Sequence, residues 1–164
     1  MRPCRARALG AVHGAGFCRE DVIRQRGATL NSQVEIHDST LAGLTPVGRD
    51  LILRLAPAYV HRSTGRPGIN PGSGWLQDLD LVVSEAVVES SPSGFPSDLS
   101  DGSFSVGEVR WDNTIPLPLA VSGVVSLTAM TVRGERLVIR GTGASVVTRG
   151  ELRYLEEFPG STGD

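Results

Sequence analysis

The sequence lacks lysine entirely, so arginine supplies all 16 of its Lys and Arg positions. Arginine's planar fork suits carboxylate and phosphate recognition, but lysine is missing from every part of the chain alike. That uniformity favours the coding bias of a GC-rich bacterial genome as the cause. Cysteine occurs only at Cys4 and Cys18, so residues 30–160 contain neither a disulfide nor a cysteine-ligated metal. Packing must hold that part of the chain together.

Clustered positive charge and long apolar runs are also missing from most of the chain. Residues 1–26 carry six arginines against two carboxylates, whereas the remainder carries ten basic against sixteen acidic side chains. A mildly acidic surface with scattered arginines argues against a nucleic-acid partner. The longest apolar run near the N-terminus, ALGAV, is too short to cross a bilayer and has no convincing cleavage site. We therefore expect no membrane partner and a cytoplasmic protein.

The length of 164 residues is enough for one domain with a real core. We expect a single β domain over residues 30–160, a disordered arginine-rich tail over 1–29 and a disordered end over 161–164. A further hypothesis places the natural start of translation inside the tail, for example at Val22. Intact mass of the protein made in its own host tests that hypothesis.

Alternating apolar residues are the strongest pattern in the sequence. From about residue 32 they recur at every second position, as in Leu51, Leu53 and Leu55 or Leu79, Leu81 and Val83. This is the period of a strand with one buried face. About eight to ten such strands predict an all-β fold, an antiparallel β-sandwich or a flattened barrel, with the sandwich preferred.

Glycines between the runs predict tight turns. Gly48, Asp101-Gly102, Arg133-Gly134 and Arg149-Gly150 each precede a new apolar run. The segment TIPLPLAV, residues 114–121, keeps the alternation but contains two prolines, so it must be an edge strand or a strap. Two segments, ESSPSGFPSDLSDG and GTGASVV, have the composition of strand connections.

The stretch IHDST places His37, Asp38 and Ser39 in a row. Consecutive strand residues point to opposite faces, so this histidine and aspartate cannot act together as a triad's base and orienter. A strand-end turn held by hydrogen bonds from side chain to backbone is the competing interpretation.

His37 and His61 are the only histidines beyond the tail. Together with a carboxylate they could form a metal site with open positions, in which Asp38, Glu156 or Glu157 would supply the oxygen. Glu156 also lies in an otherwise apolar register of the C-terminal strand, where an unpaired carboxylate is costly to bury. The alternative for Glu156 is a pairing with His37, His61 or Arg62. Without a metal, the histidines are polar groups hydrogen-bonded at strand ends.

Residues 59–75, YVHRSTGRPGINPGSGW, are expected to form a long loop. Loops beyond about twelve residues are uncommon in compact domains and are often functional. His61, Arg62, Arg66 and Trp75 together with exposed backbone donors would suit a carboxylate, a phosphate or a sugar. The competing interpretation is a plain hairpin connection that Trp75 pins by burying its ring.

Four short motifs resemble those of a group of small uncharacterised bacterial β-rich proteins: HDSTL at 37–41, HRSTGRPG at 61–68, IPLP at 115–118 and YLEEFPG at 154–160. The likeness covers about residues 30–160 and implies a β-rich fold without assigning a catalytic residue. The opening His-Asp-Ser element also resembles that of some toxin-immunity proteins.

The sequence thus predicts a non-catalytic binding or interaction module that needs no cofactor. Its ligand would be a protein or a small anionic or sugar molecule, and the protein a monomer or homodimer. The site would combine residues of both segments: His37, Asp38, Ser39, His61, Arg62, Arg66, Trp75 and Glu156. One alternative is an immunity-like inhibitor that presents Asp78, Asp80 and Glu85 to a basic toxin. Another is a metal-dependent enzyme using His37, His61 and Glu156.

Overall fold

The structure is a computed structural model that describes residues 30–161. All regular secondary structure in this range is β-strand. The strands are β1 (Asn31–Glu35), β2 (Thr40–Val47), β3 (Asp50–Ser63), β4 (Gly72–Ser84), β5 (Val87–Ser90), β6 (Ser97–Val106), β7 (Val109–Asp112), β8 (Thr114–Leu117), β9 (Ala120–Thr131) and β10 (Arg136–Phe158). The predicted all-β class is confirmed. The predictions for residues 1–29, including the alternative start, lie outside the described residues.

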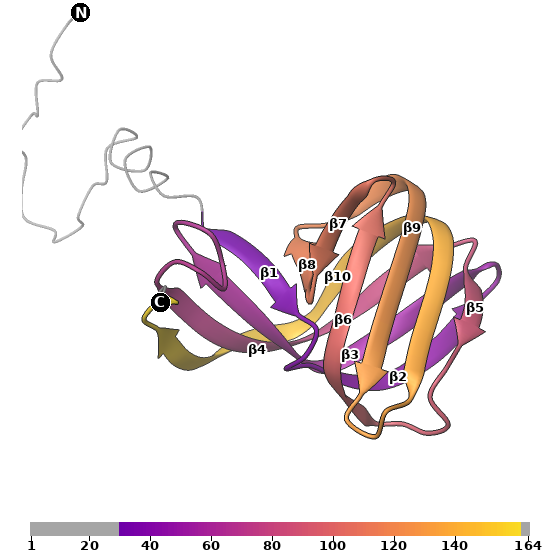
Figure 1. Ribbon diagram of the computed structural model, residues 1–164, viewed down its shortest axis with the longest axis horizontal. Coiled ribbons are helices and arrows are strands. Elements are labelled where there is room, and N and C mark those ends of the chain that lie inside the picture. The colour runs from indigo at the N-terminus through magenta and orange to yellow at the C-terminus, as the bar shows by residue number, and fades with distance from the viewer. Residues whose placement is uncertain (1–29, 162–164) are drawn as a thin grey trace, which may run out of the picture.

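The ten strands form one antiparallel sheet that curls on itself (Figure 1). Its order is β2-β6-β9-β10-β4-β3-β1-β8, with β5 paired to β10 and β7 to β6. Strand β2 also pairs with β3, and it meets β6 through Thr40 and Leu41 only. The sheet therefore encloses a core without forming a clean barrel.

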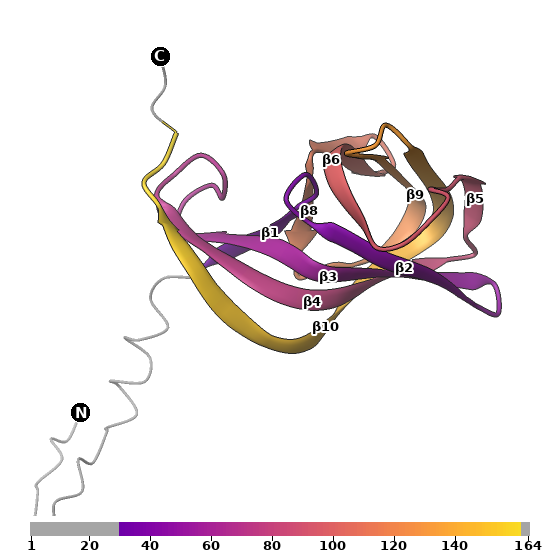
Figure 2. The same ribbon diagram turned by 90° about the horizontal axis from the view of Figure 1, so that it is seen from below.

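Beyond the enclosed region, part of the sheet continues as an extension that we call the sheet arm (Figure 2). The arm consists of residues 31–35 of β1, 59–63 of β3, 72–76 of β4 and 153–158 of β10. Strand β10 is 23 residues long and pairs with β9 and β5 at its start and with β4 along the rest. Because one strand runs through both parts, the core and the arm belong to one continuous sheet.

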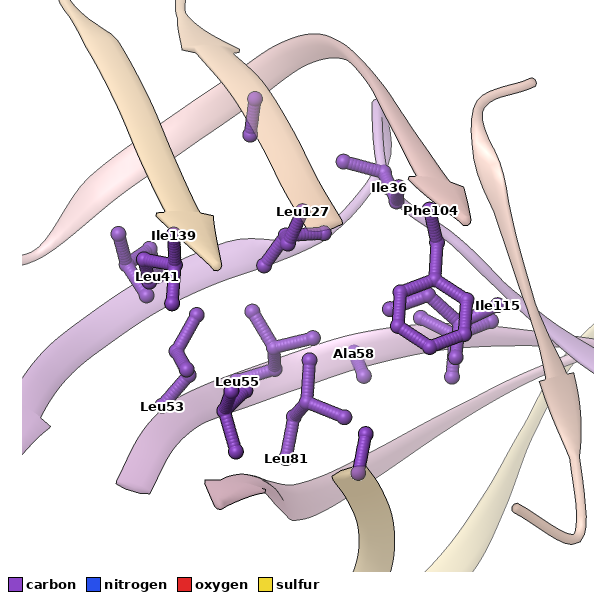
Figure 3. Close-up of a cluster of buried hydrophobic side chains, with 14 of the residues drawn as sticks. Ile36, Leu41, Leu53, Leu55, Ala58, Leu81, Phe104, Ile115, Leu127 and Ile139 are labelled. Atoms are coloured by element: carbon purple, nitrogen blue, oxygen red, sulfur yellow. The ribbon is translucent and has the colours of Figure 1, made fainter. Parts of the chain in front are cut away.

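The core confirms the two-residue alternation. Leu51, Leu53 and Leu55 of β3 lie opposite Val83, Leu81 and Leu79 of β4, and all six are at most 4% exposed. Leu41, Phe104, Ile115, Leu127 and Ile139 close the core from the other strands (Figure 3). Burying a side chain of this size stabilises the fold by about 1.5 to 3 kcal/mol.

Two of the predicted turns are confirmed and two are wrong. Gly48 and Gly134 occupy the β2–β3 and β9–β10 turns, each with positive φ. Asp101-Gly102 instead lies inside β6 at a register shift, where Asp101 Oδ1 accepts a hydrogen bond from the Gly102 amide, and the β6–β7 turn uses Gly107. Arg149-Gly150 lies at a register shift inside β10. Each dipeptide therefore lies at a β-bulge within a strand that continues beyond it.

Other connections also differ from expectation. GTGASVV is part of β10, where the register against β9 shifts between Gly141 and Gly143. Of ESSPSGFPSDLSDG, the residues from Ser97 onward belong to β6. Strand β8, which contains Ile115, Pro116 and Leu117 and ends before Pro118, pairs only with β1, which confirms the edge assignment.

The predicted long loop at 59–75 is wrong as well. Residues 59–63 complete β3 and residues 72–75 begin β4, so only residues 64–71 lie outside strands. The glycines and the hydroxyl residues obscured the alternation in the sequence.

Within residues 30–161 no helix offers the length and apolar character needed to cross a membrane.

Candidate functional site

The sheet arm has one face that collects polar and aromatic side chains. The β-pairing aligns Asn31 with Ser63, Gln33 with His61, Glu35 with Tyr59, and Gly74 of β4 with both His61 and Glu156. Directly opposed residues of a sheet share a face. We call this the polar face of the arm. The intervening residues Val34 and Val60 point the other way, into the core.

A carboxylate lies between the two histidines on this face. His61 Nδ1 is 3.0 Å from Glu35 Oε1, and His37 Nε2 is 3.6 Å from Glu35 Oε2. His61 is only 1% exposed, and its ring meets the Phe158 ring edge-on with centroids 4.4 Å apart. Its Nε2 atom is buried without a hydrogen-bond partner. His61 is therefore a buried support for Glu35 and does not reach the surface, contrary to its predicted place in an exposed loop.

Asn113 fixes the orientation of the His37 ring. Its Oδ1 accepts a hydrogen bond from the His37 amide at 3.0 Å, so its Nδ2 must face His37 Nδ1 and donate to it. The proton of the neutral ring then lies on Nε2, which is 2.9 Å from Asp38 Oδ2. His37 and Asp38 of the β1–β2 turn thus lie beside Glu35 at the end of β1. The expectation that His37 and Asp38 point apart is wrong, because both lie in the turn and not on a strand.

Tyr59 and Glu156 form a second pair across β4. The Tyr59 hydroxyl donates to Glu156 Oε1 at 3.0 Å. The ring crosses Gly74, where a Cβ atom would be only 2.1 Å from the Tyr59 hydroxyl oxygen, so glycine is required. Burial raises the pKa of Tyr59, and the hydrogen bond to Glu156 raises it further. Glu156 is therefore paired as expected for a carboxylate in an apolar register, but with Tyr59 and not with His37, His61 or Arg62.

Residues 64–71 form a loop that folds over the polar face. Asn31 and Gln33 donate side-chain hydrogen bonds to the carbonyls of Gly65 and Pro67, at 2.7 and 3.1 Å. On the other side Ser161 donates to the carbonyl of Ile69. The loop is thus attached both to β1 and to the segment that follows β10, so it is held in place without Trp75.

A cleft of about 600 Å³ opens between β1, this loop and the β7–β8 segment. Its walls are Asn31, Gln33 and Glu35 from β1, Gly65 to Ile69 from the loop, and Arg110 to Thr114 from β7 and β8. The volume falls within the range of small-molecule sites, about 300 to 1,000 Å³. Of the predicted site residues, only Arg66 lines this cleft directly, while His37, Asp38 and His61 surround its Glu35 wall.

The opposite face of the arm holds Arg62 and Trp75. The Arg62 guanidinium carbon is 5.6 Å from the centre of the Trp75 ring, and Tyr154 meets that ring edge-on at 5.3 Å. A register shift between Tyr154 and Glu156 places these two residues on opposite faces. The single surface predicted from His37 to Trp75 is therefore divided between two sides of one sheet.

Ser39 has a structural role that matches the turn interpretation. Its hydroxyl donates to the Glu35 carbonyl at 2.7 Å and accepts from the Tyr59 amide at 3.0 Å. The side chain is 2% exposed. Ser39 therefore joins the end of β1 to β3 beneath the surface.

Asp80 is held within the protein by two arginines. Its side chain is 1% exposed and accepts hydrogen bonds from Arg54 and from Arg149, the latter at 2.8 Å. These contacts, that of Arg54 first, hold the pKa of Asp80 below its usual value. Of the carboxylates in the immunity-like alternative, Asp78 and Glu85 remain at the surface.

The three proposed metal ligands His37, His61 and Glu156 are not gathered around one point, because Glu156 bonds to Tyr59 and His61 to Glu35. Among the described residues, a different trio comes together: ligand atoms of Glu35, His37 and Asp38 lie within 4.8 Å of one another. A cation at His37 Nε2 would require that atom's lone pair, whereas the Asn113 contact leaves a proton there. The geometry of the trio fits a cation, but its hydrogen bonding does not.

No family model, no curated protein and no solved structure matches this chain. The resemblance to small bacterial β-rich proteins and to toxin-immunity proteins stays a prediction.

Sequence reasoning missed most of the cleft. Glu35, the partner of both histidines, was not among the predicted site residues. Arg110, Trp111 and Asn113 gave no signal, because they lie about 75 residues from β1 in sequence and meet it only through the β1–β8 pairing. The alternation that places Glu35 and His37 on one side was the available clue.

Proposed function

We propose that this protein is a non-catalytic binding module, and that its ligand occupies the cleft between β1, loop 64–71 and the β7–β8 segment. The observation that carries this proposal is the construction of the cleft. A loop attached to β1 by side-chain hydrogen bonds and to Ser161 by a backbone hydrogen bond covers a row of polar side chains on the sheet. Preformed clefts with a few fixed polar groups are typical of small-molecule sites.

The residues around Glu35 support binding more than catalysis. His61 is enclosed by Phe158 and Glu35, and His37 is held by Asn113 and Asp38. Neither ring has both a free nitrogen and access to the cleft, which a general base needs. What remains at the cleft is a row of polar side chains and Arg66, which is exposed.

A thermal-shift screen of small polar molecules tests the proposal with two matched variants. Arg66→Gln removes a cleft residue, whereas Arg133→Gln removes an exposed arginine in the β9–β10 turn. We expect at least one compound to raise the melting temperature of the parent and of Arg133→Gln but not of Arg66→Gln. Equal responses of all three proteins would place the ligand elsewhere, and no response to any compound would oppose the proposal.

A second candidate function, a metal-dependent enzyme, is favoured only by the proximity of the Glu35, His37 and Asp38 ligand atoms, and it requires that the Asn113 contact with His37 be given up. Titration of the protein with Zn²⁺ or Mn²⁺ tests it. Stoichiometric binding that His37→Ala abolishes and His61→Ala leaves intact would favour a metal centre at Glu35, His37 and Asp38 over a metal-free cluster of these side chains. The immunity-like alternative stays a prediction that rests on Asp78 and Glu85, because Asp80 is buried.

A further inference from the structure

The β1 wall of the cleft offers hydrogen-bond acceptors at regular intervals. Asn31, Gln33 and Glu35 share one face and lie two residues apart, so they repeat about every 7 Å over roughly 13 Å. The amide nitrogens of Asn31 and Gln33 donate to loop carbonyls. Their Oδ1 and Oε1 atoms are left to accept, and so is Oε2 of Glu35, whose Oε1 already contacts His61 Nδ1. A wall of this kind binds a ligand rich in hydroxyl donors.

The opposite wall carries a positive charge without a counter-ion. Among residues 30–161, no carboxylate forms an ion pair with the Arg66 guanidinium, and that side chain is exposed. Arg110 in the same cleft is already paired with Asp112 at 2.8 Å. The available partner for Arg66 is therefore an anionic group on the ligand, and a guanidinium binds a carboxylate in a bidentate manner.

Trp111 adds an apolar surface whose orientation is fixed. Its ring stacks on the buried Phe104 ring with centroids 5.8 Å apart and planes 24° apart. The side chain is half-buried and lines the cleft. An immobile aromatic plane beside hydrogen-bond acceptors suits a ring that is apolar on one face and hydroxylated at its edge.

We propose, on the basis of the proposed function, that the ligand is an acidic sugar: a short oligosaccharide that contains a uronic acid. Its carboxylate pairs with Arg66, its hydroxyls donate to Asn31, Gln33 and Glu35, and a ring face rests on Trp111. The length of the acceptor row favours more than one sugar unit. A free amino acid fits less well, because Glu35 is flanked by His61 and His37 and is a poor bare counter-ion for an ammonium group.

Calorimetric titration separates charge recognition from hydroxyl recognition. The probes are glucuronate- and galacturonate-containing disaccharides, their methyl esters, a sugar phosphate, acetate and inorganic phosphate. The esters keep every hydroxyl and lose the charge. We expect at least one free acid to bind at least tenfold more tightly than its own ester, and neither acetate nor phosphate to bind comparably.

The variants make the assignment specific. Arg66→Gln should reduce the affinity for the acid to that for the ester and leave ester binding unchanged, while Arg133→Gln should leave both unchanged. Circular dichroism and the melting temperature confirm that each variant is folded. Equal affinities of acid and ester, tighter binding of the sugar phosphate, or binding of acetate and phosphate as tight as that of the acid would overturn the acidic-sugar inference.

Absence of any uronate binding would also overturn it. Arg66-dependent binding of another compound in the thermal-shift screen would then preserve the proposed binding function. Absence of every response in that screen would oppose both proposals, so the two failures are distinguishable.

Discussion

Replacement of Asp80 by asparagine should destabilise the protein in a pH-dependent way. The carboxylate is 1% exposed and is bound by Arg54 and Arg149, which are themselves 46% and 53% exposed. A charge-assisted hydrogen bond contributes about 1.5 to 3 kcal/mol. Because water can rehydrate both arginines once the charge is gone, we take the low end of this range and expect a loss of about 1.5 to 2 kcal/mol at pH 7.

The pH dependence follows from the lowered pKa of Asp80. In the unfolded chain an aspartate titrates near about 3.9. Above that pH the folded protein gains the full stabilisation, and the gain is lost as the pH falls below it toward the folded-state pKa. The difference between parent and Asp80→Asn should therefore be constant from about pH 5 to 7 and smaller at pH 3.

Urea unfolding followed by tryptophan fluorescence measures this difference at pH 7 and pH 3. Glu89→Gln is the control, because Glu89 pairs with Arg140 at 2.8 Å but both side chains are exposed. That substitution should cost less than about 0.5 kcal/mol. An Asp80→Asn cost as small as the control, or the same cost at both pH values, would refute the reasoning.

Three further predictions concern the polar face. Gly74→Ala should cost about 2 kcal/mol, because the new Cβ meets the Tyr59 hydroxyl, and an unchanged melting temperature would contradict that contact. In the Tyr154→Phe variant, Tyr59 is the one remaining tyrosine, and it should show no phenolate absorbance at pH 10 in the folded protein. The free energy of unfolding should fall as the pH rises above about 10, because there Tyr59 ionises only in the unfolded chain. Titration of Tyr59 in the folded protein at the usual pH of a tyrosine would oppose this. Asn113→Ala should cost about 1 kcal/mol more than Asn113→Gly, because both lose the His37 contact but only glycine tolerates the φ of 59° without strain. Equal melting temperatures of these two variants would argue against the strained turn.

The sequence predicted the fold through its strongest physical signal. Alternation at Leu51–Leu55 and Leu79–Val83 identified two strands that pair in register, and the prolines at 116 and 118 identified the edge. Turn positions were less predictable, because a glycine has similar neighbours in the sequence whether it lies in a turn between two strands or at a β-bulge within one strand. Asp101-Gly102 and Arg149-Gly150 are examples of the second kind.

The candidate site was only partly predictable, for a different reason. The local pattern shows that Glu35 and His37 lie on one side, but not that His61 is buried beneath a loop or that Asn113 approaches from the β7–β8 connection. Those relations depend on strand order and on register shifts in β10, one of which separates Tyr154 from Glu156. Strand order is a long-range property that short windows of sequence do not carry.

The most direct measurement of the binding site is a titration of ¹⁵N-labelled protein with a ligand from the screen, followed by amide chemical shifts. Binding in the cleft predicts the largest changes at residues 31–35, 65–69 and 110–114, and little change at Arg62, Trp75 and Tyr154 on the other face of the arm. Changes concentrated at Arg62, Trp75 and Tyr154, with the cleft amides unmoved, would contradict the assignment.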